Sequence, residues 1–167
     1  MKDLAAFQGE NKLNSAANYF EGWYFKHSKG DICISFIPGI NIQNGEKHAF
    51  IQVVTKSTSY YIDYDFSTFK FSSSPFSVQI GNNFFSDNKI KLDIDDKTKN
   101  IKIVGILYYS RRQELKKTLL SPNIMGPFSY LPFMECNHAI ISMKHSIMGR
   151  LTINDDALSF DNGVRIH

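Results

Sequence analysis

The sequence has few of the features that organise small secreted, zinc-binding or membrane-spanning proteins. It contains two cysteines in 167 residues, Cys33 and Cys136, and no Cys-x-x-Cys pair. That excludes a zinc ribbon and a disulfide framework as the basis of the fold. No stretch approaches the ~18 consecutive apolar residues of a membrane-spanning helix. The first residues lack the basic start and apolar run of a secretory signal. We therefore expect a cytoplasmic protein without a transmembrane segment.

Charge of one sign is also scarce. The net charge is +3, from 19 basic and 16 acidic residues, and the cations are scattered apart from a short cluster at 111–117. Nucleic-acid-binding proteins usually show a basic stripe interleaved with aromatic residues. We therefore expect no nucleic-acid partner. The glycine pattern of a P-loop, Gly-x-Ser-x-Gly and His-Glu-x-x-His are absent too, which argues against the enzyme classes that those motifs mark.

Aromatic side chains in alternating patterns are what the sequence has in excess. Phenylalanine occurs 14 times and tyrosine 8 times, against one tryptophan. Apolar and polar residues alternate through 60–66 and 89–95, and 101–109 is almost uniformly apolar. Such runs are typical of strands with one or two buried faces. Many short strands separated by turn signals predict an all-β protein, either an antiparallel lipocalin-like barrel or a strongly curved sheet with little helix.

Turn and breaker residues divide the chain into elements. We expect strands at 19–27, 32–37, 48–55, 60–66, 76–80, 89–95, 101–109, 139–148, 150–153 and 157–160. Asn44-Gly45 is expected to form a hairpin turn, because both residues tolerate positive φ. Pro38-Gly39 is also expected to be a turn, and 111–120 is the best helix candidate. Three of the five prolines fall in 121–133, which predicts a long loop of the kind that often carries function.

Two segments carry a resemblance to a known family. The first reads Tyr-Phe-Glu-Gly-Trp-Tyr-Phe-Lys at 19–26, followed by Ile-Pro-Gly-Ile at 37–40 and His-Ala-Phe-Ile-Gln at 48–52. The second reads Ser-Pro-Asn-Ile-Met-Gly-Pro-Phe at 121–128 and runs into Leu-Pro-Phe-Met-Glu-Cys-Asn-His at 131–138. With Ser-Met-Lys-His at 142–145 and Gly149, these segments resemble bacterial members of the tocopherol cyclase family over nearly the whole chain.

The resemblance implies a lipocalin-type barrel, distantly like the carotenoid hydratase group. The family's reaction adds a proton to a prenyl double bond, and the neighbouring phenol oxygen captures the cation to close a chromanol ring. No metal or organic cofactor is implied. Family members continue past the glycine near Gly163 into a second β-rich half. We therefore expect residues 1–167 to be one β-barrel-like domain, the N-terminal half of a two-part architecture. An incomplete barrel would expose a strand edge that promotes self-association.

A cyclase of this kind needs a proton donor in a dry pocket walled by aromatic rings. A buried carboxyl group can stay protonated and act as an acid, and aromatic faces stabilise a carbocation. Glu21 and Glu135, which lie among apolar neighbours in the resembling segments, are the candidate acids, with His138 as a catalytic proton relay. The candidate ligand-binding residues are Trp23, Tyr24, Phe128, Phe133 and His145.

Each of these residues also has a structural interpretation. Glu21 and Glu135 could instead form a salt bridge or a hydrogen bond, to Lys26 or to a backbone amide. Trp23 and Tyr24 should point to opposite faces of one strand, and Trp23 could simply fill the core. His48, His138 and His145 lack the spacing of metal ligands. Asp63 and Asp65 are expected on a solvated outer face, and would be acids only if that face lined a lumen.

Two functions remain open on the sequence. The first is a tocopherol cyclase-like enzyme acting on a prenylated phenol or quinol. The second is a lipocalin-like carrier of a hydrophobic small molecule, which needs no carboxyl group in its cavity because apolar burial supplies most of the affinity. In both cases the expected partner is a hydrophobic, isoprenoid-like small molecule. Peripheral contact with a membrane and self-association through a strand edge are compatible with either.

Overall fold

The computed structural model describes residues 7–14, 18–113, 144–160 and 164–165, with the backbone alone for 111–113, 144–145 and 164–165. Antiparallel strands make up most of this part of the chain. The helices within it are two single 3-10 turns, η1 (Glu10–Lys12) and η2 (Phe66–Thr68). The protein is therefore all-β with little helix, as the sequence predicts.

The first sheet contains five strands and forms one layer of the fold. They are β1 (Tyr19–Gly22), β2 (Phe25–Lys29), β3 (Ile32–Gln43), β4 (Glu46–Thr55) and β5 (Ser59–Asp65). The order is β1-β3-β4-β5, and β2 also pairs with β3. The long strand β3 thus takes two short partners in succession, β2 along 32–36 and β1 along 39–42.

The second sheet follows the chain as an antiparallel meander. Its strands are β6 (Phe69–Ser73), β7 (Phe76–Ile80), β8 (Asn83–Ser86), β9 (Lys89–Asp96), β10 (Ile101–Gln113), β11 (Lys144–Ile153) and β12 (Asp156–Ser159). The short strand β13 (Val164–Arg165) pairs with β11 beside β12. Each strand from β6 to β12 pairs with the next.

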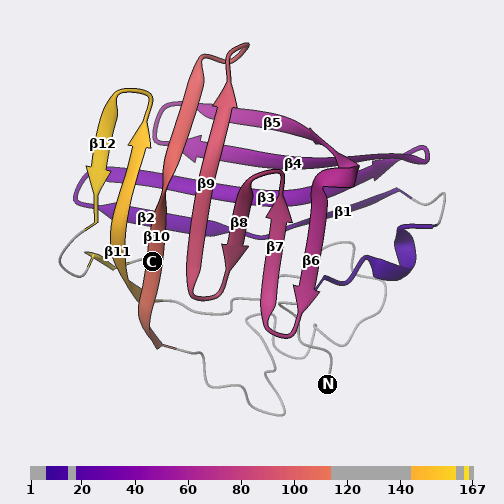
Figure 1. The fold of residues 1–167 in the computed structure, drawn as a ribbon, viewed down its shortest axis with the longest axis horizontal. Coiled ribbons are helices and arrows are strands. Elements are labelled where there is room, and N and C mark those ends of the chain that lie inside the picture. The colour runs from indigo at the N-terminus through magenta and orange to yellow at the C-terminus, as the bar shows by residue number, and fades with distance from the viewer. Residues whose placement is uncertain (1–6, 15–17, 114–143, 161–163, 166–167) are drawn as a thin grey trace.

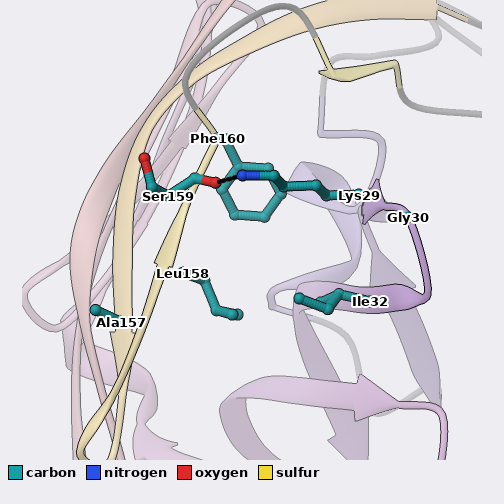
Figure 2. Close-up of a pocket in the computed structure, with 7 residues that line it drawn as sticks. All are labelled: Lys29, Gly30, Ile32, Ala157, Leu158, Ser159 and Phe160. Atoms are coloured by element: carbon teal, nitrogen blue, oxygen red, sulfur yellow. Dashed lines mark hydrogen bonds between the residues drawn. The ribbon is translucent and has the colours of Figure 1, made fainter.

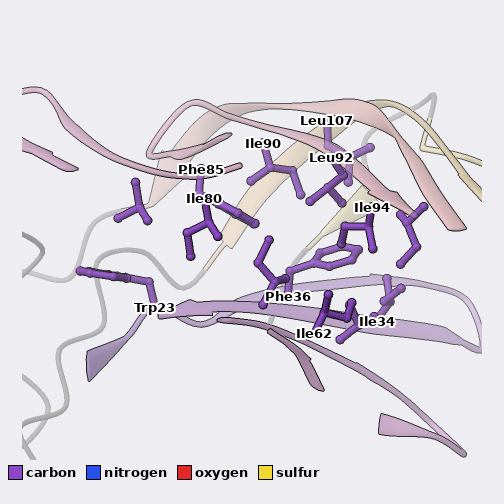
Figure 3. Packing of buried hydrophobic residues seen from close by; sticks show 14 of the residues in the cluster. Trp23, Ile34, Phe36, Ile62, Ile80, Phe85, Ile90, Leu92, Ile94 and Leu107 are labelled. Carbon is purple, nitrogen blue, oxygen red and sulfur yellow. The ribbon is translucent and has the colours of Figure 1, made fainter. Parts of the chain in front are cut away.

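The two sheets face each other, and the strands of one run across those of the other (Figure 1). Among the described strands no ladder joins the two sheets. Of the two architectures expected, curved open sheets are therefore present and a closed barrel is not. One apolar cluster fills the space between the layers, with Phe36 and Ile62 from the first sheet meeting Ile80, Phe85 and Leu92 from the second (Figure 3).

Alternation explains most of the strands. In β9 the side chains alternate between exposed and buried from Lys89 to Asp95, so Ile90, Leu92 and Ile94 all enter the core. The Asn44-Gly45 turn is also confirmed. Both residues have positive φ, 53° and 84°, and Gln43 pairs with Glu46 to close a two-residue hairpin loop between β3 and β4.

The expected turn at Pro38-Gly39 is wrong, because β3 runs straight through it. The carbonyl of Pro38 accepts a hydrogen bond from the backbone amide of Trp23 at 2.9 Å. The N–H and C=O of one strand residue point toward the same neighbour, so the amide hydrogen that proline lacks would face the break between β1 and β2. A Cβ on Gly39 would lie 2.4 Å from the Phe50 ring and 2.5 Å from the Glu21 carbonyl oxygen, so this position requires glycine.

Four further strands differ from expectation. Strand β10 continues to Gln113, so residues 111–113 are strand where the sequence suggested the start of a helix. Pairing with β11, which continues past a register shift to Lys144, overrides the local preference. The strand expected to end at 148 and the one expected to start at 150 are a single strand, β11, which passes through Gly149. Strands β6 and β8 were not anticipated.

Candidate functional site

The inner face of β1 and β2 carries a row of large side chains. Odd-numbered residues from Tyr19 to His27 point toward the second sheet, because successive side chains of a strand alternate between faces. Trp23 is 8% exposed and His27 is fully buried, whereas Tyr24 is 63% exposed on the outer face. The alternation continues across the break between the two strands, so Trp23 and Tyr24 lie on opposite faces as predicted.

The carboxylate of Glu21 is a hydrogen-bond acceptor for the N-terminal segment. The backbone amide of Gln8 donates to both carboxylate oxygens at 3.0 Å, and the amide of Gly9 donates to Oε2 at 3.0 Å. The Tyr19 hydroxyl also donates to Oε2, at 2.6 Å. Burial, the hydrogen bond and the charge of Glu21 raise the pKa of Tyr19, so its phenol stays neutral and remains a donor. Glu21 thereby ties residues 8–9 to β1.

Trp23 packs in an aromatic cluster beside this tether. Its ring centroid lies 6.3 Å from that of Phe7, 6.0 Å from Phe76 and 6.4 Å from Phe69. Phe7 also contacts Phe71 at 4.6 Å. Trp23 therefore fills the core and holds the same N-terminal segment that Glu21 binds. Tyr24 lies outside, where its hydroxyl accepts a hydrogen bond from Ser35 Oγ at 3.0 Å.

A buried pair that sequence reasoning missed lies farther along β2. Nε2 of His27 is 2.7 Å from the Tyr109 hydroxyl, so one group donates to the other according to the tautomer. The His27 ring also contacts Phe36 at 5.6 Å and Phe160 at 6.3 Å between centroids. Burial raises the pKa of Tyr109 well above its ordinary value. A neutral phenol bonded to an imidazole in an apolar setting is a candidate proton-transfer pair.

A cavity of about 460 Å³ opens at the edge of the sandwich, between the β2–β3 turn and β12. Ile32 and Leu158 face each other across it (Figure 2). The Lys29 ammonium crosses the opening and donates a hydrogen bond to the backbone carbonyl of Ser159. The residues that line the cavity are Lys29, Gly30, Ile32, Ala157, Leu158, Ser159 and Phe160.

Phe160 connects the cavity with the buried pair. One part of it lines the cavity, and its ring packs edge-on against His27. The backbone amide of Phe160 donates to the Gly149 carbonyl at 2.8 Å, which anchors the ring to β11. Glu21 is eight residues before Lys29 on the same edge, on the order of 25 Å away at ~3.3 Å per residue. The Glu21 cluster and the cavity are therefore two separate places.

Several candidate residues lie outside the described part of the chain. These are Glu135, His138, Phe128 and Phe133; His145 belongs to β11, with only its backbone described. Asp63 and Asp65 are exposed on the outer face of β5, as expected. Asp65 accepts a hydrogen bond from the Ser67 amide at 2.8 Å and caps η2, which lowers the pKa of its carboxyl group.

The described residues lack two kinds of feature. They hold no cluster of three or more histidine, cysteine, aspartate or glutamate side chains suited to a metal ion. They also include no helix that is long and apolar enough to cross a membrane.

Comparisons with known proteins do not extend this picture. No protein-family model, no curated protein and no solved structure matches the chain.

Proposed function

We propose that the protein binds a hydrophobic small molecule in the cavity between the β2–β3 turn and β12. The observation that carries this proposal is an apolar cavity of about 460 Å³ with a single ammonium group at its opening. Small-molecule sites typically measure about 300–1,000 Å³ and combine apolar walls with a few placed polar groups. Ile32, Leu158 and Phe160 would supply the walls.

The lining also suggests which part of the ligand lies where. An apolar body against these walls is stabilised by ~25 cal/mol for each Å² of apolar surface that it removes from water. Lys29 already donates to one oxygen, the Ser159 carbonyl, and a ligand oxygen at the opening could take that place. The ligand class is therefore an apolar chain with an oxygen-bearing head group. The prenylated phenols and quinols suggested by the family resemblance belong to this class.

Ring closure of such a ligand is the second candidate function. The specific observation in its favour is the His27–Tyr109 pair, one aromatic ring behind the cavity wall. Cyclisation is an isomerisation: a proton adds to the prenyl double bond, the phenol oxygen captures the tertiary cation, and the phenol proton is released. This pair is a better candidate than Glu21, because Phe160 links it to the cavity wall, whereas the Glu21 oxygens accept four hydrogen bonds elsewhere.

Binding is tested by titrating the protein with a prenylated quinol and following its affinity by calorimetry. Leu158→Asp, which places a charge in the cavity wall, should abolish binding, and Lys29→Met should weaken it several-fold. Lys97→Met is the matched control, because Lys97 is exposed in the β9–β10 turn away from the cavity. Unchanged affinity in both cavity variants would refute the proposal.

Catalysis is tested separately from binding, by measuring chromanol formation. The protein is incubated with the prenylated quinol and the chromanol product is sought by chromatography. If the second candidate is right, chromanol forms and Tyr109→Phe and His27→Gln slow its formation while leaving ligand affinity nearly unchanged. Binding without any chromanol would support a carrier instead of an enzyme.

A further inference from the structure

The outer face of the second sheet combines exposed apolar side chains with cations. The strand registers place Phe84, Lys91, Ile106 and Arg150 side by side in one row across β8 to β11. The adjacent row contains Lys89, Tyr108 and Met148. We call these two rows the basic face.

The apolar residues of the basic face are unusually open to solvent. Ile106 is 36% exposed, Tyr108 51% and Met148 54%. They are neighbours on β10 and β11, so they form one continuous patch instead of isolated side chains. Scattered exposed apolar residues are normal, but a contiguous patch rimmed by charge marks an interaction surface.

The charged residues paired with this patch across the strands are all cations. Ile106 pairs with Lys91 on one side and with Arg150 on the other, and Lys89 pairs with Tyr108. Lys89 also lies over the Phe84 ring, with Nζ 5.4 Å from its centroid. The nearest carboxylates of β9 and the turn before it are Asp93, one row farther along the strand, and Asp87. Within the two rows themselves the paired residues include three cations and no carboxylate.

The outer face of the first sheet provides a contrast within the same molecule. It also exposes aromatic rings, because Phe20 is 64% and Tyr61 39% exposed. The charged residues beside Tyr61 on β5 are carboxylates, Asp63 and Asp65. The Tyr61 side of the first sheet and the basic face therefore both expose apolar groups, in surroundings of opposite charge.

We propose that the basic face docks the protein peripherally on a membrane surface rich in anionic lipid. Shallow burial of Ile106, Tyr108 and Met148 among the lipid head groups would remove apolar surface from water. Lys89, Lys91 and Arg150 would lie against the lipid phosphates at the same time. This inference does not depend on the cavity, although Arg150 pairs with Ser159 of β12, whose residues line it.

The size of the effect follows from general electrostatics of lipid surfaces. Each cation near an anionic surface contributes about fivefold to affinity. Replacing both Lys91 and Arg150 with glutamine should therefore weaken binding about 25-fold. Replacing Ile106 with asparagine should weaken it about tenfold through lost apolar burial. Raising the salt concentration from about 0.1 M to 1 M shortens the screening length from about 10 Å to 3 Å, and should release the protein.

The experiment is co-sedimentation of the whole 167-residue protein with vesicles. One vesicle is phosphatidylcholine alone, and the other is an equimolar mixture of phosphatidylcholine and phosphatidylglycerol. The parent protein should pellet with the mixed vesicles and remain in solution with the neutral ones. Lys97→Gln, which removes an exposed charge in the turn after β9, is the control and should behave like the parent. Lys91→Gln/Arg150→Gln and Ile106→Asn should remain largely in solution with both. All substituted residues are exposed, and matching thermal unfolding midpoints would confirm that the variants fold.

Three results would overturn the inference. They are no binding of the parent to mixed vesicles, equal binding to both compositions, and an equal loss in Lys97→Gln and the basic-face variants. Lys29→Met separates this inference from the ligand proposal, because the substitution should weaken binding of the prenylated quinol and leave vesicle binding unchanged.

Discussion

Replacing Glu21 with glutamine separates a structural role of this residue from a catalytic one. The carboxylate accepts hydrogen bonds from the amides of Gln8 and Gly9 and from the Tyr19 hydroxyl. Glutamine has nearly the same shape, but it replaces one acceptor oxygen with a donor NH₂ group and removes the charge. Hydrogen bonds to charged groups contribute about 1.5–3 kcal/mol each, and part of this loss is recovered by water because the site is only half-buried. We therefore expect a loss of about 2 kcal/mol in the free energy of unfolding.

The assay uses the only tryptophan of the chain as its reporter. A loss of about 2 kcal/mol lowers the unfolding midpoint by roughly 4–8 °C in a protein of this size. Release of the N-terminal segment removes Phe7 from Trp23, so the Trp23 emission should shift to longer wavelength in the folded state. Asp63→Asn, an exposed carboxylate on β5, should change neither property.

One outcome contradicts the structural role of Glu21 directly. If Glu21→Gln keeps the midpoint and the Trp23 emission of the parent but abolishes chromanol formation, then Glu21 is a catalytic acid and the tether is incidental. If the variant is destabilised and any chromanol activity scales with the folded fraction, the residue acts through structure. The two explanations therefore predict opposite combinations of stability and activity.

Three further predictions concern other parts of the fold. Gly149 has φ +132° and a Cβ there would meet a carbonyl oxygen at 2.2 Å, so Gly149→Ala should cost about 3 kcal/mol in a denaturant titration. Gly45→Asn should cost only about 1 kcal/mol, because nothing lies near a Cβ there and only the positive φ of 84° is unfavourable. Hydrogen bonds led by that from Thr98 lower the pKa of Asp96 to about 2. The contribution of Asp96 to the free energy of unfolding is therefore present above the unfolded pKa of about 3.9 and is lost as the pH falls toward 2. Asp96→Asn should reduce this loss of stability at acid pH, measured by circular dichroism. Burial raises the pKa of Tyr109, so the neutral phenol contributes to the free energy of unfolding below about pH 10, and this contribution is lost as the pH rises through the pKa of the folded state. Tyr109→Phe should remove this loss of stability at alkaline pH in the same measurement.

The parts of the fold that local pattern determines could be predicted from the sequence. Strand β9 alternates without interruption, and Asn44-Gly45 has the backbone freedom that a two-residue hairpin loop needs. Strands β6 and β8 are only five and four residues long, and their ends carry polar residues, Ser72 and Ser73 in β6 and Asn83 and Ser86 in β8, that are typical of turns. They form because β7 lies between them and supplies hydrogen bonds to both.

In the candidate site, too, features set by local pattern could be predicted and features set by long-range contacts could not. Alternation predicted that Trp23 and Tyr24 lie on opposite faces, and the structure shows that Trp23 is the buried one and Tyr24 the exposed one. The pairing of His27 with Tyr109 joins residues 82 positions apart, and no local pattern connects them. One signal could have pointed to His27. It lies four residues after Trp23, so strand alternation puts both side chains on the same inner face, where a histidine has apolar neighbours.

Gly149 connects the parts of the molecule on which both proposals depend. Its positive φ keeps β11 continuous where a side chain would strike the carbonyl oxygen of Ile106, a residue of the basic face. Its own carbonyl oxygen accepts the hydrogen bond that holds Phe160 at the cavity. The close approach of β10 and β11 thus depends on Gly149 and also on Gly105, where a Cβ would lie 2.1 Å from the Arg150 carbonyl oxygen. The position of the cavity wall depends on Gly149 through its hydrogen bond to Phe160. Gly149 has no side chain that could act on a ligand or a lipid, so the chemistry of both proposals must be sought in the side chains that its backbone geometry positions.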